Sequence, residues 1–109
     1  MKDIYVKKFS QFPGPRREAI GPNSGERFRD EVLHKELREN PGVKLRVILD
    51  GTAGYGSSFL EEAFGGLVRL GIPANTIRDI VANLVSEEDP SLIEEIKEYV
   101  DEALDEAER

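Results

Sequence analysis

The sequence predicts a small α/β layered fold in one domain that spans residues 1–109. Segments with strand-like and helix-like patterns alternate along the chain in the order β-α-β-α-β-α, which implies a sheet covered by helices and joined by right-handed crossovers. A length of 109 residues is typical of a single domain. The chain closes with an acidic helix that we expect at residues 90–107.

The first element is a half-buried strand, predicted from Ile4, Val6 and Phe9, which alternate after allowing for a slip at the lysines. The stretch "SQFPGPRREAIGPN" follows and indicates a long loop, which could contain a short extended segment at "RREAI". Long loops in small domains are often functional, so Arg16 and Arg17 are candidate contacts for a partner. An ordinary solvated basic loop is the alternative.

A helix and a strand come next. Asn23 or Ser24 would cap the helix, and Asn23 has capping-box spacing with Glu26. Apolar residues at helical intervals form its inner stripe: Phe28, Val32, Leu33 and Leu37. "NPG" ends the helix, and "VKLRVILD" predicts a strand with one apolar face and, from Val43 and Ile48, partial cover on the other face as well.

The second helix begins at the two serines of "SSFLEEAFGGLVRLG", where Ser58 and Glu61 have capping-box spacing. Gly65 and Gly66 inside it each cost about 1 kcal/mol relative to alanine, which suggests close packing against a neighbouring element. Residues 79–85 are predicted as a third strand because β-branched residues are frequent there, although their spacing is also helical. In the last helix, Asp89 is the expected cap and Pro90 the first residue.

Composition excludes several classes of function. The chain has no cysteine and one histidine, His34, which we expect to face solvent, so no metal site and no cofactor are predicted. The charge is uneven, with a net +4 over residues 1–46, −2 over 47–85 and −9 over 86–109. This acidic total of −7 argues against nucleic-acid binding. Without a membrane-spanning run or a signal sequence, we expect a cytoplasmic protein that does not bind membranes.

The glycine-rich turn in "RVILDGTAGYGSSFLEE" resembles two nucleotide motifs and matches neither. Gly51, Gly56, Ser57 and Ser58 have the spacing of a Walker A loop, but Ser57 replaces the lysine that contacts the β- and γ-phosphates. The pattern G-x-G-x-x-G fails because Phe59 occupies its third glycine position. We therefore do not expect a nucleotide-hydrolysing enzyme.

Two serines at the start of a helix remain to be explained. A hydroxyl at this position would lie on the rim of the sheet, and an attached phosphate would meet the positive end of the helix. Ser58 and Ser57 are therefore candidate phosphoacceptors. The alternative is that both serines only cap the helix.

The segment "VILDGTAGYGSSFLEEAFGGL" resembles STAS domains of the anti-sigma-factor antagonist type, in which a strand ending in Asp leads to Asp-Ser-Ser-Gly at a helix start. It is more similar still to STAS-like domains of unknown function, whose pattern includes "GPR" and "SGERFRDEV" upstream. The resemblance covers about residues 13–70 and is most specific at Asp50, 54–60 and 64–66. Gly56 stands where the antagonists have an acidic residue, and Phe59 where they have glycine.

The resemblance implies a non-catalytic signalling module. Antagonists of this type bind histidine-kinase-like ATPases that also act as anti-sigma factors, and phosphorylation of a serine releases them. The partner surface implied here runs from Asp50 through the turn and the helix start, and the residues proposed for it are Asp50, Gly54, Tyr55, Gly56, Phe59, Glu61 and Glu62.

Two other functions remain open from the sequence. The backbone N–H groups of residues 54–58 could hold a small anion or a nucleotide, with Arg16 or Arg17 closing over it. The acidic C-terminal helix could instead pack against another chain in an assembly. The oligomeric state is not predicted.

Overall fold

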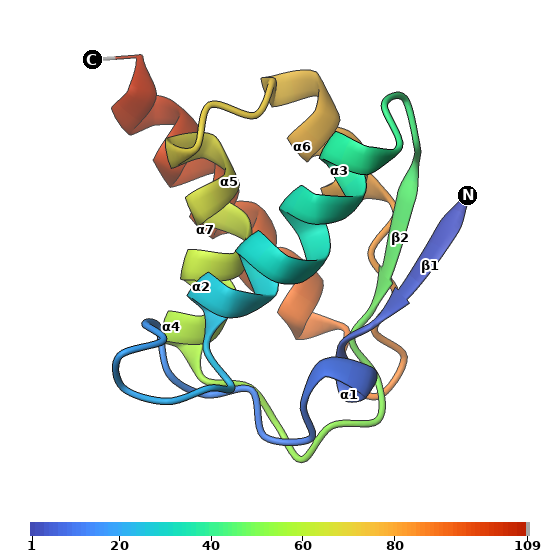
Figure 1. Ribbon diagram of the computed structural model, residues 1–109, viewed down its shortest axis with the longest axis vertical. Helices are drawn as coiled ribbons and strands as arrows, with labels where there is room; N and C mark the ends of the chain where they lie inside the picture. Colours follow the sequence, from blue (N-terminus) through green and yellow to red (C-terminus); the bar gives the residue numbers. More distant parts are fainter. Residues whose placement is uncertain (109) are drawn as a thin grey trace.

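The computed structural model describes residues 1–108. Two parallel strands lie side by side along one side of the molecule, and most of the helices lie on the other side (Figure 1). The elements, in chain order, are β1 Lys2–Tyr5, α1 Val6–Phe9, α2 Gly25–Phe28, η1 Arg29–His34, α3 Lys35–Glu39, β2 Leu45–Ile48, α4 Ser57–Leu60, η2 Glu61–Gly65, α5 Gly66–Arg69, α6 Ala74–Ala82 and α7 Ser91–Ala107.

Two of the helices are continuous rods made of several labelled pieces. α2, η1 and α3 form one helix over residues 25–39, and α4, η2 and α5 form another over residues 57–69. η1 and η2 are π-helical stretches in the middle of each rod. The apolar stripe predicted for each helix faces the core, with Phe28 and Leu33 buried in the first and Phe59 and Phe64 buried in the second.

The sheet is parallel, with Lys2 opposite Leu45 and Tyr5 opposite Ile48. Its inner face is apolar, since Ile4, Leu45 and Val47 are buried in the core. Its outer face carries an ion pair instead, because Arg46 Nε donates to Asp3 Oδ1 at 2.8 Å and both side chains are partly exposed. The expectation that the second face of this strand is also partly covered agrees with the half-buried Val43 and Ile48 and fails at Arg46, which is exposed.

The predicted third strand at residues 79–85 is also wrong, since α6 occupies Ala74–Ala82. Ile77 and Ile80 are buried three residues apart, so the helical spacing and not the β-branched content decides this segment. One trace of the strand remains. Val85 forms a parallel bridge with Ile48, and Val85 N donates to Val47 O at 3.0 Å.

The predicted first strand ends earlier than expected, at Tyr5. The slip in its alternation marks the start of α1, a short helix in which Val6 is buried and Phe9 half-buried. The "RREAI" stretch forms turns and no extended piece.

Side-chain hydrogen bonds show which residue caps the helix over residues 25–39. Ser24 caps the first long helix, because its Oγ accepts the N–H of Arg27 at 3.1 Å. The capping box between Asn23 and Glu26 is wrong, since the Glu26 carboxylate accepts the N–H of Glu18 instead.

At the last helix the predicted start is one residue early, since α7 begins at Ser91 with Pro90 as its N-cap residue, although Asp89 supplies a side-chain contact at the helix start. Asp89 Oδ1 accepts the N–H of Ser91 at 3.2 Å, and Pro90 already has helical dihedral angles. α7 packs against η2, α5 and α6, and its buried residues Ile96, Val100 and Ala103 belong to the core. Among the helices of residues 1–108, none is long and apolar enough to span a bilayer.

Candidate functional site

The predicted junction between a strand and a helix exists. β2 ends at Ile48, a turn with positive φ at Gly51 and Gly54 follows, and α4 begins at Ser57. Asp50 holds the turn against the segment that precedes α7. Its carboxylate accepts hydrogen bonds from the backbone N–H groups of Glu87 and Glu88 at 3.1 and 2.8 Å. Asp50 is therefore occupied in tying the turn to the segment before α7.

Both serines are exposed on the first turn of the helix over residues 57–69. The N-cap residue is Gly56, and no side chain caps the helix. The predicted capping box between Ser58 and Glu61 is therefore wrong, because Ser58 lies inside the helix and not at its cap. The alternative that the serines only cap the helix fails for the same reason.

Ser57 has a neighbour that Ser58 lacks. The Tyr99 hydroxyl donates to Glu95 Oε2 at 2.7 Å, which raises the pKa of Tyr99, and the nearby Ser57 side chain opposes that rise. Within residues 1–108, no side-chain hydrogen bond involves either serine hydroxyl, and the two differ in that Ser57, unlike Ser58, lies near Tyr99.

Phe59 is placed differently from the sequence prediction. It is fully buried and lies among three other aromatic rings, with centroid distances of 5.8 Å to Phe28, 6.0 Å to Tyr55 and 6.4 Å to Phe9. Its assignment to the partner surface is therefore corrected, since Phe59 anchors the helix start in the core.

The N-terminal loop covers part of the junction. Gly56 N donates to Pro13 O at 3.0 Å, and a Cβ at position 56 would lie 2.4 Å from Gly14 O. Such a contact is too short for any side chain. The acidic residue of the phosphorylatable antagonists has no room at Gly56 in this backbone arrangement.

The Tyr55 side chain bridges the turn back to the residue that follows β2. Its hydroxyl donates to Leu49 O at 2.7 Å, and burial raises the pKa of that hydroxyl to about 12. Tyr55 is half-buried, so part of its ring remains on the surface.

Glu61 and Glu62 are the centre of an ion-pair cluster that also contains Arg16, Arg17, Arg29 and Arg69. Glu62 is buried, pairs directly with Arg29, and lies 3.2 Å from Arg16 and 3.4 Å from Arg69. Glu61 pairs with Arg16 and accepts from Arg69 at 2.9 Å. Each carboxylate therefore has more than one arginine.

The ion pairs with Arg16 and Arg69 lower the pKa of Glu61. Burial alone would raise it, but hydrogen bonds from Arg69 and Arg16 lower the pKa below its ordinary value.

The expectation that close packing surrounds the helix glycines is confirmed, because a Cβ at Gly66 would lie 2.8 Å from both Arg29 Nη1 and Glu62 Oε2. The small residue makes room for the buried ion pair.

These contacts leave the two predicted arginines occupied. Arg16 holds Glu61 and Glu62, and Arg17 lies 3.7 Å from both Glu26 and Glu62. Two donors of the turn are also engaged, since Gly54 N donates to Thr52 Oγ1 at 3.3 Å and Gly56 N to Pro13 O.

Sequence reasoning missed an exposed aromatic residue beside the turn. Phe12 is 69% exposed, and its neighbour Gln11 accepts the N–H of Ala53 at 2.8 Å. A cavity of about 340 Å³ lies on the other side of the turn, with the carboxylates of Glu88 and Glu95 in its lining. An apolar residue next to Pro13 in a loop was the only signal for Phe12 in the sequence.

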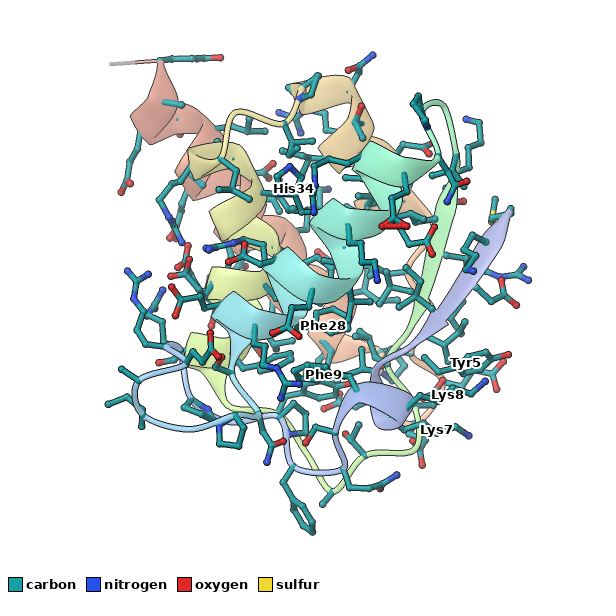
Figure 2. All side chains as sticks on the ribbon, in the orientation of Figure 1. Tyr5, Lys7, Lys8, Phe9, Phe28 and His34 are labelled. Atoms are coloured by element: carbon teal, nitrogen blue, oxygen red, sulfur yellow. The ribbon has the colours of Figure 1, made fainter. Side chains whose placement is uncertain are left out.

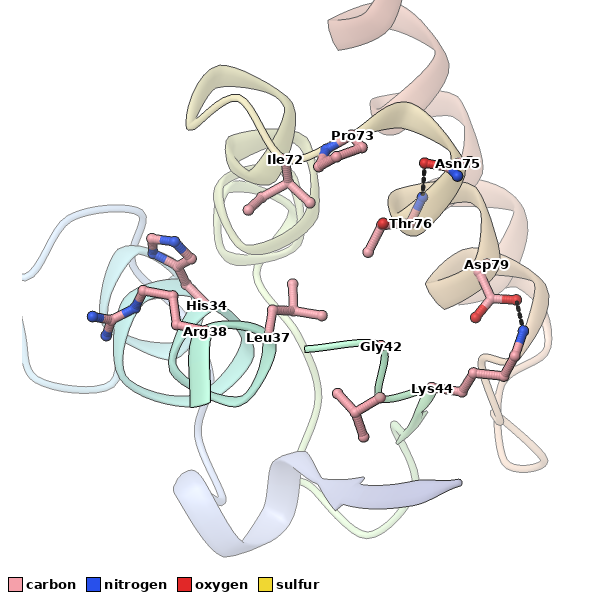
Figure 3. A pocket seen from close by; sticks show the side chains of 11 residues that line it. His34, Leu37, Arg38, Gly42, Lys44, Ile72, Pro73, Asn75, Thr76 and Asp79 are labelled. Carbon is pink, nitrogen blue, oxygen red and sulfur yellow. Dashed lines mark hydrogen bonds and ion pairs between the residues drawn. The ribbon is translucent and has the colours of Figure 1, made fainter. Parts of the chain in front are cut away.

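His34 lies away from this junction. It is half-buried and lines a cavity of about 410 Å³ between α3, the segment before β2 and the start of α6 (Figure 3). The expectation that it faces open solvent is therefore only partly right. Nothing brings it near the serine pair.

A strand that passes through a glycine-rich turn into a helix bearing exposed serines is the feature on which the resemblance to STAS-like domains rests. The comparison with known families agrees, since the model of the STAS-like domain of unknown function matches residues 24–90. The chain belongs to that family. The match begins after the "GPR" stretch and extends beyond residue 70, through α6 to the start of the last helix. No curated protein and no solved structure matches the chain.

Proposed function

We propose that the chain is a non-catalytic signalling module that binds a protein through the accessible residues of the rim, Tyr55 to Ser58 and Glu61, and is switched by phosphorylation at Ser58; Phe59 and Glu62 are buried beneath it. The observation that carries the proposal is the exposure of both serines at the start of the helix that follows β2. The partner that we propose is a histidine-kinase-like ATPase that also acts as an anti-sigma factor. Membership of the STAS-like family supports this choice of partner.

Ser58 is the better acceptor, with Ser57 as the second candidate. A phosphate on Ser57 would lie near Tyr99 and the Glu95 carboxylate that Tyr99 contacts, and like charges would oppose it. Ser58 makes no such contact among the described residues. Its position inside the helix also frees its hydroxyl from the capping duty that the sequence suggested.

The transfer step needs the ATPase, ATP with its Mg²⁺ ion, and this chain. The Ser58 hydroxyl oxygen forms a bond to the γ-phosphorus of ATP, the bond to the β-phosphate oxygen breaks, and ADP leaves. The hydroxyl proton passes to a base on the kinase.

Phosphorylation of Ser58 would act on the ion-pair cluster around Glu61 and Glu62. Ser58 precedes these residues by three and four positions, so all three lie on one side of the helix. A phosphate there would compete with both carboxylates for Arg16. Loss of Arg16 would loosen the loop that covers Gly56 and so change the docking rim.

Anion or nucleotide binding by residues 54–58 has less support. Two of the donors and both candidate arginines are already engaged within the chain. A thermal-shift screen with nucleotides separates the two proposals, because a ligand at 100 times its Kd adds about 2.7 kcal/mol of stability.

The phosphorylation test uses the full chain, ATP and each histidine-kinase-like ATPase encoded near its gene. We expect a stable complex without ATP and, with ATP, a mass increase of about 80 Da, the mass of one phosphoryl group. The increase should disappear in Ser58→Ala and persist in the matched control Ser57→Ala. If none of these ATPases forms a complex with the chain or modifies it, the proposal fails.

A further inference from the structure

The two-stranded sheet leaves one edge of β1 without a neighbouring strand. β1 pairs only with β2 within residues 1–108, and Lys2 N donates to Lys44 O at 2.8 Å on that side. Successive backbone groups of a strand point in opposite directions, so the N–H and C=O groups of Asp3 and the N–H group of Tyr5 point to the outer edge, whereas the C=O group of Tyr5, the N-cap residue of α1, accepts the first hydrogen bond of that helix. A row of unpaired donors and acceptors is where an extended segment can add to a sheet.

A groove of about 550 Å³ runs along this open edge. All four residues of β1 line one wall, and no residue of β2 contributes. The other wall is the helix over residues 25–39, which contributes Arg27, Glu31, Lys35 and Glu39 at intervals of four. We call this the β1–α3 groove. A strand edge facing a helix across a groove is an arrangement that can hold one extended peptide.

The floor of the groove is apolar. Phe9 and Val32 are half-buried there and pack against the core. Phe9 packs edge-on against Phe28, with ring centroids 5.3 Å apart, and the two labelled residues are neighbours in Figure 2. This floor fits one apolar side chain that points inward from a bound segment.

The rim of the groove carries two cations without a carboxylate partner. Lys2 pairs with Glu36 at 3.4 Å and Arg27 with Glu31 at 2.8 Å. Lys8 lies 4.9 Å from the centre of the Tyr5 ring, and both are near Lys7 in Figure 2. Neither Lys8 nor Lys35 has a carboxylate oxygen within 4 Å in the described part of the chain, whereas Glu39 is the one lining carboxylate left without a cation there.

We propose that the β1–α3 groove binds an extended segment of a partner protein, which adds to β1 as an outer strand. The segment carries an apolar residue over Phe9 and Val32 and an acidic residue beside Lys8 and Lys35. Main-chain hydrogen bonds to Asp3 and Tyr5 supply affinity, and the alternate side chains supply specificity. This surface differs from the serine rim, so the inference does not depend on the phosphorylation switch.

A second copy of the chain is a poorer occupant than a partner segment. An isologous dimer would pair β1 with the β1 of the other copy in antiparallel orientation. Lys2 at one end of the strand would then approach Lys7 and Lys8 at the other end of its mate. Like charges placed opposite one another destabilise a strand pair, whereas an acidic segment meets the same lysines favourably.

The test begins with a displayed library of random 12-residue peptides, selected on the full chain. The best binder is then resynthesised with a single N-methyl group at each position in turn. In strand addition, only alternate N–H groups of the peptide face β1, so alternate positions should lose about tenfold in affinity while those between are unaffected. A peptide that tolerates every N-methyl group, or that loses affinity without this period of two, would overturn the proposal, as would a selection that yields no binder.

Two matched variants place the peptide on the protein. Lys35→Glu should weaken binding of the selected peptide about fivefold, since it reverses a rim charge. Arg38→Glu makes the same charge change three residues on, beside a different cavity, and should leave binding unchanged. Thermal unfolding of both variants controls for folding.

Amide hydrogen exchange supplies an independent readout. The N–H groups of Asp3 and Tyr5 should exchange rapidly in the free chain and become protected when the peptide binds. Protection of both groups in the peptide-free chain, together with a dimer in light scattering, would assign the edge to a second copy and refute the partner segment.

Discussion

At the scale of single residues, Glu62 is the most constrained charged group in the molecule. It is 1% exposed and has the guanidinium groups of Arg29, Arg16 and Arg69 around it. Burial of a carboxylate is tolerated only when its charge is compensated, and removing one partner of a buried pair leaves the other unpaired. The sequence showed Glu61 and Glu62 as exposed rim residues because Arg16 and Arg29 lie 46 and 33 positions away from Glu62, beyond the reach of any local pattern.

Replacement of Glu62 should therefore be far more costly than replacement of its neighbour. We expect Glu62→Ala to lower the free energy of unfolding by about 3 kcal/mol, because Arg29 Nη1 would be left buried without its acceptor and Arg29 would keep only its pair with the exposed Asp30. Glu61→Ala is the matched control and should cost about 1 kcal/mol or less, since its partners are partly exposed. Chemical denaturation of both variants measures the difference, and equal losses would show that burial of Glu62 carries no special weight.

At the scale of elements, the sequence predicted helices well and the edges of the sheet poorly. Both long helices and α7 lie where their apolar stripes placed them, because burial of a continuous stripe determines a helix strongly. α6 was misread as a strand although its helical spacing was visible, and its β-branched residues reflect packing against β2 and α7 rather than sheet formation. The strand that ends at Tyr5 could not be separated from α1 by alternation alone.

The serine residues at the two helix starts provide a test at this scale. Ser24 is buried and caps its helix, so Ser24→Ala should cost about 1 kcal/mol of stability. Ser58 caps nothing, and Ser58→Ala should change stability by less than about 0.5 kcal/mol. Equilibrium denaturation of both variants checks the contrast. A large loss in Ser58→Ala would mean that its hydroxyl has a structural role, and that variant could then no longer serve as a clean phosphorylation control.

At the scale of the whole molecule, α7 is part of the core and not an appendage. The helix is strongly acidic, with seven Asp or Glu against one Lys in residues 91–107, which suggested a docking helix in the sequence. Its inner face packs against η2, α5 and α6, and three of its apolar side chains are buried. The acidic face remains available for a partner, but the helix itself cannot be removed without opening the core.

Truncation tests this distinction between a core helix and a detachable one. A chain that ends at Glu88 loses Ile96, Val100 and Ala103, and each fully buried Ile or Val contributes about 1.5–3 kcal/mol. Because small domains are stable by only about 5–15 kcal/mol, we expect this chain to lose its cooperative thermal transition, as followed by circular dichroism. A chain that ends at Leu104 keeps those three residues and should unfold within a few degrees of the full chain. If the shorter chain unfolded as cooperatively as the full chain, α7 would not be needed for the core. That result would favour the alternative in which the acidic helix packs against another chain.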